Sequence, residues 1–369
     1  MESPDATLHA RRALKAHALM LARFERRDGS LRRDGRLHPP GTVAHLWPFA
    51  RAFVATLDVA GMDASLLAGA AFAGFPGEPV IARRLRMLER YWDARGPAYA
   101  SDPPSPLTKL LGGGDIYYDD NAWAGLALVQ LARQRPGASR LDRAARLADF
   151  ARGGWDRNPH APHPGGVFWV QQGRGLGARN HDRNAISTAP NAELILHLEA
   201  LGALEGSRDT RQDPDPAEMA VWVAAALGTG EGLVRDKIRG DGTIDPALWS
   251  YNQGSLLGLH ALLADRGGPD APAHLRQAEA IAAAALQHQT ARRWAGEPVE
   301  FIAILMRNLL LLSARSGDAP LRQRIGEALC ERAEAAWPID PHATLLEHSA
   351  AVTLQALVAW APDDHRLLA

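Results

Sequence analysis

About twelve segments of this sequence repeat their apolar residues with the 3.6-residue period of an α-helix, and almost no stretch alternates as a β-strand does. Gly and Pro residues separate the segments. Their approximate spans are 6–28, 43–60, 78–95, 119–134, 139–152, 185–203, 215–227, 247–265, 271–289, 299–315, 320–336 and 347–361. The pattern predicts an all-α protein.

The odd-numbered segments are amphipathic. In the third segment, Val80 and Leu88 belong to an apolar face, whereas Arg83, Arg84 and Arg86 are expected on the opposite face, in water. A helix with one apolar face packs that face on a core and leaves the other exposed. These segments are therefore predicted to lie on the outside of the molecule.

The even-numbered segments are apolar on nearly every side. Between residues 122 and 132, for example, Gln130 is the only polar side chain. Helices of this kind are buried all round. Six exposed helices alternating with six buried ones predict an (α/α)6 barrel, with an outer ring wrapped around an inner ring. No second core is needed, so we expect one domain over residues 1–369.

The connections differ between the two ends of this predicted barrel. Long segments rich in Gly, Pro and aromatic residues lead into even-numbered helices at 96–118, 153–184 and 228–246, whereas the connections at 135–138, 266–270 and 316–319 are short. The long loops therefore gather at the end where the inner helices begin. A cleft and its chemistry are expected at that end.

Composition limits the kind of partner. The chain has 41 Lys and Arg residues against 42 Asp and Glu residues, so no net charge attracts nucleic acid or an anionic membrane. Cys330 is the only cysteine. The N-terminal stretch has neither the apolar run of a signal peptide nor that of a membrane span. We expect a cytoplasmic monomer with an uncharged ligand and no cofactor.

The strongest local motif stands where a long loop enters the fourth, buried helix. It comprises Tyr117, Tyr118, Asp119, Asp120, Asn121 and Trp123. Asp and Asn residues favour helix N-termini, so a capping role is one interpretation. Capping needs only one such residue, however, and two adjacent carboxyls supply what glycosidic bond cleavage requires, an acid and a nucleophile or base. Neighbouring residues at a helix start hold their carboxyls about 5–6 Å apart, near the retaining geometry.

Aromatic and amide residues recur where other inner helices begin. They suit a pyranose, which offers both CH faces and hydroxyl groups. The candidate binding residues outside the fourth helix are Trp47, Trp169, Asn184, Asn191, Glu193, Trp249, Tyr251, Asn252, Gln253, Glu300 and Phe301. We expect Asp119, Trp169, Glu193 and Tyr251 to point into one shared cleft.

Several of these motifs resemble glycoside hydrolase family 76, the α-1,6-mannanases. The resemblance rests on Tyr-Tyr-Asp-Asp-Asn-Ala-Trp at 117–123, Gly-Gly-Val-Phe-Trp at 165–169, Asn191 with Glu193, and Trp-Ser-Tyr-Asn-Gln-Gly at 249–254. It implies an (α/α)6 barrel, an α-1,6-mannoside as substrate, and cleavage with retention. By motif, Asp119 corresponds to the nucleophile and Asp120 to the acid/base. Departures from the family pattern, such as Ala124, lie around the cleft and not at the aspartates.

Two alternatives remain open at this level. A sugar 2-epimerase on the same toroid would need histidines in the cleft, which His45 and His348 are placed to supply. A non-catalytic glycan-binding protein would keep the cleft without turnover. No metal is expected, because His160 and His163 lie in a Pro-rich loop without a placed carboxylate.

Overall fold

The computed structural model describes residues 4–33, 42–62, 66, 77–105, 114–138, 140–204, 213–288 and 296–369. Within these ranges the chain is mainly helical, and each named strand is two residues long. The all-α prediction is confirmed. The predicted helix limits at 139 and 289, and part of the predicted loop 96–118, lie outside the described residues.

One set of helices forms an inner ring. Each of its members contacts the next, and the last contacts the first. The members are α2 (Leu46–Ala60), α6 (Tyr118–Gln134), α8 (Ala185–Ala200), α10 (Ser250–Arg266), α13 (Val299–Ser313) and α15 (Leu345–Val358). These are the even-numbered segments of the sequence, so the predicted inner ring is confirmed.

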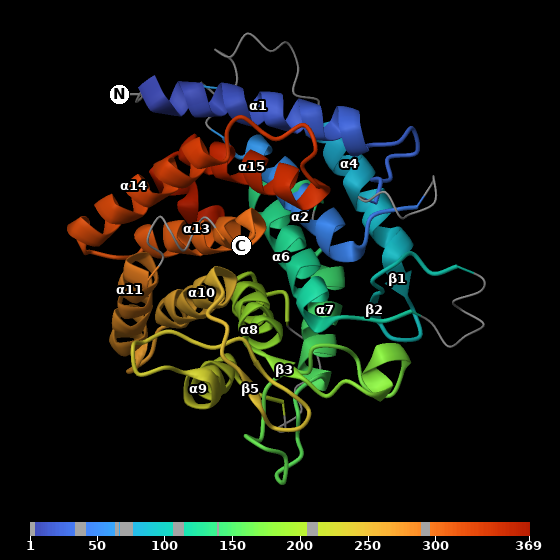
Figure 1. Ribbon diagram of the computed structural model, residues 1–369, viewed down its shortest axis with the longest axis vertical. Helices are drawn as coiled ribbons and strands as arrows, with labels where there is room; N and C mark the ends of the chain where they lie inside the picture. Colours follow the sequence, from blue (N-terminus) through green and yellow to red (C-terminus); the bar gives the residue numbers. More distant parts are fainter. Residues whose placement is uncertain are drawn as a thin grey trace.

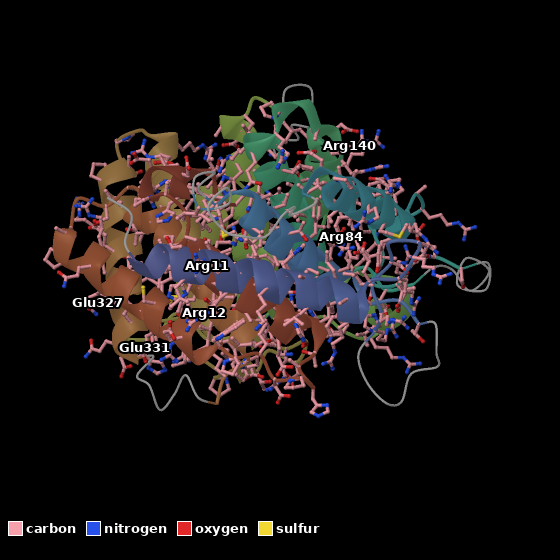
Figure 2. All side chains as sticks on the ribbon, turned by 90° about the horizontal axis from the view of Figure 1, so that it is seen from above. Arg11, Arg12, Arg84, Arg140, Glu327 and Glu331 are labelled. Atoms are coloured by element: carbon pink, nitrogen blue, oxygen red, sulfur yellow. The ribbon has the colours of Figure 1, made fainter. Side chains whose placement is uncertain are left out.

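A second set of helices covers this ring from outside. α1 lies against α15 and α2, and α7, α9, α11 and α14 each bridge two successive inner helices (Figure 1). The set comprises α1 (Pro4–Phe24), α4 (Gly77–Leu88), α7 (Leu141–Gly153), α9 (Pro216–Leu227), α11 (Ala271–His288) and α14 (Ala319–Ala335). Figure 2 shows charged side chains on this outer layer, including Arg11 of α1 and Glu331 of α14.

Arg84 corrects one detail of the sequence prediction. It was expected in water, but it is fully buried, with its guanidinium near Glu25 (3.4 Å) and donating to the carbonyl of Gly29 (3.2 Å). Helical geometry explains this result, because residue 84 follows Val80 and Ile81 by four and three positions and so shares their face.

The inner ring also contains a buried polar network far along its helices. Asp58 of α2 pairs with Arg307 of α13 and accepts hydrogen bonds from Gln130 of α6 (2.9 Å) and Thr353 of α15 (2.9 Å). Arg307 also donates to Gln130 (2.8 Å). Four inner helices are thus joined by groups that are at most 4% exposed. The polar Gln130 in an otherwise apolar run belongs to this network.

Short strands order the loops that lead into the inner helices. β1 (Trp92–Asp93) pairs with β2 (Ala98–Tyr99) ahead of α6. β3 (Arg183–Asn184), β4 (Lys237–Ile238) and β5 (Ile244–Asp245) form an antiparallel sheet that joins the loops preceding α8 and α10 (Figure 1). Loops far apart in sequence are thereby fixed around the same end of the ring. No helix among the described residues is long and apolar enough to span a membrane.

Candidate active site

A cleft of about 580 Å³ opens where the inner helices begin. Its position agrees with the end of the barrel that the loop lengths predicted. Its lining residues come from the starts of all six inner helices and from the loops before them: His45, Trp47, Pro48, Ser101, Tyr117, Asp119, Asp120, Trp123, Trp169, Asn184, Ile186, Asp236, Lys237, Tyr251, Phe301 and Leu346.

Asp119 and Asp120 occupy the first turn of α6 and line the cleft. One oxygen of Asp119 accepts a hydrogen bond from the backbone N–H of Asp120 (3.0 Å), and the other accepts from the indole Nε1 of Trp169 (3.2 Å). Asp119 therefore satisfies one backbone N–H of the first turn, although the N-cap residue, Tyr117, makes no side-chain cap bond. Both oxygens are nevertheless held in defined directions, and Asp120 is left as a second carboxyl beside them.

The two carboxyls have different proton affinities. Burial raises the pKa of Asp119 to about 7, and the charge of Asp236 adds to this rise. The hydrogen bonds that Asp119 accepts from the backbone and from Trp169 oppose it. Burial raises the pKa of Asp120 well above its usual range, and the nearby charges of Asp119 and Asp102 raise it further. Since Asp119 accepts hydrogen bonds that favour its anion, Asp120 is the residue that keeps the shared proton.

A third carboxyl, Asp236, faces the same cleft from the residue before β4. One of its oxygens accepts from the hydroxyl of Tyr251 (3.2 Å) and from the amide of Asn252 (3.0 Å). Burial raises its pKa. Asp236 was absent from the candidates taken from the sequence, as was its neighbour Lys237. The sequence does place their loop, 228–246, at the cleft end of the barrel. Loop length alone does not indicate which residues of that loop face the cleft.

Aromatic rings form two walls of the cleft. On one wall, the rings of Tyr251 and Phe301 stack with centroids 4.1 Å apart, and Trp47 lies 6.0 Å from Phe301. On the other wall, the centroids of Tyr117 and Trp169 are 5.0 Å apart. Flat apolar surfaces beside carboxyls can bind the CH faces of a sugar while its hydroxyls meet polar groups.

About half of the residues expected from the sequence line this cleft. They are Trp47, Tyr117, Asp119, Asp120, Trp123, Trp169, Asn184, Tyr251 and Phe301. Of the four residues expected to share one cleft, Asp119, Trp169 and Tyr251 do so. Glu193 does not line it.

Three of the remaining candidates contact segments outside the cleft. The amide of Asn121 exchanges hydrogen bonds with the backbone of Tyr99 (2.8 and 2.9 Å), which fixes β2 to the start of α6. Gln253 does the same for the backbone of Val234 (2.8 Å for both bonds). Tyr118 stacks on Phe150 of α7, with centroids 4.3 Å apart, outside the cleft. These three side chains do not line the cleft but contact the segments around it.

The other candidates lie next to the cleft or below it. Asn191 donates to the carbonyl of Tyr118 (3.1 Å), and Asn252 donates to Asp236. Trp249 packs edge-on against Phe301. Glu300 lines a neighbouring cavity of about 500 Å³, which shares His45, Pro48 and Leu346 with the cleft.

Glu193 lies within the ring and is only 2% exposed. It stands eight residues beyond the start of α8, which places it about 12 Å along the helix axis. Burial raises its pKa well above the usual range, which favours the neutral form of the carboxyl. This neutral form explains how an acid is accommodated there without a paired cation.

Metal ligands are not grouped in the described part of the chain. No cluster of three or more His, Cys, Asp or Glu residues with suitable geometry occurs in the residues that the structure describes. Of the two histidines considered for epimerase chemistry, His45 lines the cleft and His348 does not. His348 is buried against Phe24, with ring centroids 5.3 Å apart.

An all-helical toroid whose cleft holds adjacent carboxyls between aromatic walls has the arrangement of a carbohydrate-cleaving hydrolase. The chain belongs to glycosyl hydrolase family 76, whose family model matches residues 106–338, more than half of its length. It is therefore a glycoside hydrolase. No curated protein matches its sequence.

Solved structures with the same fold include members of this family. An α-1,6-mannanase of Salegentibacter sp. HEL1_6, solved as an inactive variant in complex with α-1,6-mannotriose, is 18% identical, with a TM-score of 0.70 over 95% of this chain and 99% of that one. A family 76 mannosidase from Bacteroides thetaiotaomicron VPI-5482 is 18% identical, with a TM-score of 0.74 over 95% and 98%. A D-mannose isomerase shares the fold at 12% identity and a TM-score of 0.62, over 97% and 99%.

Proposed function

We propose that this enzyme hydrolyses α-1,6-linked mannosides with retention of configuration, with Asp119 as nucleophile and Asp120 as acid/base. The observation that carries the proposal is the pair of consecutive carboxyls in one cleft. Asp119 accepts a hydrogen bond from Trp169, and Asp120 retains its proton more strongly. A glycosidase needs one ionised carboxyl and one protonated carboxyl at the same bond, and this pair supplies both at neutral pH.

The reaction proceeds in two steps. Asp120 donates its proton to the glycosidic oxygen while an oxygen of Asp119 forms a bond to the anomeric carbon, and the bond to the leaving sugar breaks. Asp120, now ionised, then removes a proton from water, which attacks the anomeric carbon and releases Asp119. Two displacements at one carbon give net retention. No metal is required, because both proton transfer and attack come from carboxyls.

The choice of mannoside rests on the relatives. The Salegentibacter α-1,6-mannanase is inactive when two consecutive aspartates are replaced by asparagine, and its complex contains α-1,6-mannotriose. The adjacent pair in this chain is Asp119 and Asp120. We infer that Asp236, which lines the cleft, accepts hydrogen bonds from sugar hydroxyls beside the reacting bond.

The deciding experiment is a product profile on linear α-1,6-mannooligosaccharides, with α-1,2- and α-1,3-linked oligosaccharides as controls. We expect cleavage of the α-1,6 series alone, and an α-configured first product followed by NMR. A β-configured first product would overturn the nucleophile assignment. Cleavage of another linkage would overturn the substrate assignment.

The same incubations test the two alternatives. Free mannose should stay unchanged, whereas an epimerase or isomerase would convert it. A non-catalytic glycan-binding protein would bind the oligosaccharides and release no product, with the same affinity after loss of both aspartates. We further propose that the enzyme is a cytoplasmic monomer, as expected from the sequence, which light scattering and cell fractionation would test.

A further inference from the structure

Lys237 is the only lysine or arginine among the cleft-lining residues in the described part of the chain. Its ammonium lies over the ring of Trp169, 5.6 Å from the ring centroid. The same indole donates its Nε1–H to Asp119 (3.2 Å). The ring of Trp169 therefore contacts both the cation of Lys237 and the carboxyl of Asp119, the candidate nucleophile.

We propose that Lys237 is a positioning residue, which acts on Asp119 through the indole of Trp169. This inference rests on the proposed function of Asp119 and adds a residue to that site. A cation over the face of an indole draws the π electrons of the ring toward itself. The N–H at the ring edge is left more positive and becomes a stronger donor. A stronger donor favours the ionised form of the carboxyl that accepts it.

The surrounding backbone holds Lys237 and Trp169 in this arrangement. The ammonium of Lys237 pairs with Asp182 (3.1 Å), and the backbone carbonyl of Asp182 accepts from the N–H of Trp169 (2.8 Å). In the sheet, Lys237 stands opposite Asn184. Trp169 is fixed on its other side, because its carbonyl accepts from the N–H of Tyr118 at the start of α6 (3.0 Å).

The other charges nearest Asp119 are carboxyls, one of which, Asp102, pairs with Arg33 and lies 3.2 Å from His45. Asp120 on α6 and Asp236 before β4 lie close to Asp119, and Asp102 acts on Asp120. The hydroxyls of Tyr117 and Tyr251 are neutral, since burial and the nearby carboxyls raise the pKa of both. Lys237 is thus the only Lys or Arg among the described cleft-lining residues, and its charge also opposes the rise in the pKa of Asp236.

The test compares Lys237→Met with Lys237→Arg in the full-length enzyme. A methionine keeps a long apolar side chain over the ring and removes the charge, whereas an arginine keeps the charge and stacks on aromatic faces. We expect Lys237→Met to move the acid limb of the kcat/KM profile upward by about half a pH unit or more, and Lys237→Arg to restore it. Arg239→Met, which removes the exposed Arg239–Asp245 pair in the same hairpin, should leave the profile unchanged.

A second measurement follows the indole directly and needs no turnover. With ¹⁵N-labelled tryptophan, and the Trp169 resonance assigned by Trp169→Phe, the Nε1–H signal should titrate with Asp119. In Lys237→Met it should move upfield at pH 8, and its titration midpoint should rise. Failure of hydrolysis in the wild-type protein would refute the proposed function and leave this readout intact. An unchanged indole titration with a raised KM would overturn the proposal and make Lys237 a substrate ligand.

Discussion

Asp119 and Asp120 are consecutive residues of one helical turn, but their surroundings assign them different protonation states. Asp119 accepts two hydrogen bonds, whereas Asp120 lies near the negative charges of Asp119 and Asp102. Two carboxyls this close titrate as a coupled pair, with one proton shared at intermediate pH. In the proposed mechanism, the active form is the singly protonated one.

The pH profile follows from this pair. Burial raises the pKa of Asp119 to about 7, so kcat/KM should rise as the pH increases through about 7 and Asp119 ionises. At higher pH it should fall, because Asp120 loses the proton that the leaving group needs. Initial rates on an α-1,6-mannooligosaccharide between pH 4 and pH 10 measure both limbs. An acid limb near pH 4 would contradict the raised pKa of the nucleophile.

Replacement of each aspartate by asparagine separates their roles. Asp119→Asn lacks the charge that attacks the anomeric carbon, so kcat should fall by at least ~10³-fold for every substrate. Asp120→Asn should lose ~10²–10⁴-fold on mannooligosaccharides but much less on an activated aryl mannoside, whose leaving group needs little protonation. Azide should accelerate only Asp120→Asn and give a glycosyl azide of retained configuration. The opposite pattern would exchange the two roles.

At the scale of elements, the start of a helix and its middle offer different environments. Asn184 stands at the beginning of α8 and lines the cleft, whereas Glu193 of the same helix lies deep in the ring. The packing around Glu193 is tight, because a Cβ on Gly258 of α10 would meet the side chains of both Asn308 and Glu193. A replacement at residue 193 should therefore keep the size of the glutamic acid and carry no charge.

We expect Glu193→Gln to fold and to be more stable than the wild type at high pH. The folded pKa of Glu193 lies above its unfolded value, so its contribution to stability is complete below the unfolded pKa and declines as the pH rises toward the folded one. The Tm of Glu193→Gln should therefore exceed that of the wild type by a few degrees at pH 8 and match it near pH 4. Glu331→Gln on the exposed face of α14 is the control. If the Tm of Glu193→Gln depended on pH in the same way as that of Glu331→Gln, Glu193 would not be a buried neutral acid.

At the scale of the whole molecule, the buried network around Asp58 ties the ring together at a distance from the cleft. Arg307→Met leaves Asp58 buried without its cation, which typically costs about 3–5 kcal/mol in the free energy of unfolding. Urea denaturation measures this loss. Arg90→Met removes an exposed pair with Asp28 and should cost less than about 1 kcal/mol. A loss of similar size in both variants would mean that the network does not stabilise the fold.

The sequence determined the ring order of the fold, because burial all round and burial on one face leave different periodic patterns. It also determined the position of Asp119 and Asp120, because a polar and aromatic cluster entering an apolar helix is visible without tertiary contacts. The start of α6 was predicted within one residue, at 119 against Tyr118.

Only the tertiary structure decided which polar residues of the same motifs face the cleft. Asn121 and Gln253 are amides beside candidate cleft residues, but their hydrogen-bonding groups are used by the backbones of Tyr99 and Val234. Asp236 and Lys237 reach the cleft through strands of two residues, which are too short to produce an alternating pattern. Helical period and composition describe how much of a side chain is buried, whereas the partner that it meets depends on which distant loops the folded ring brings together.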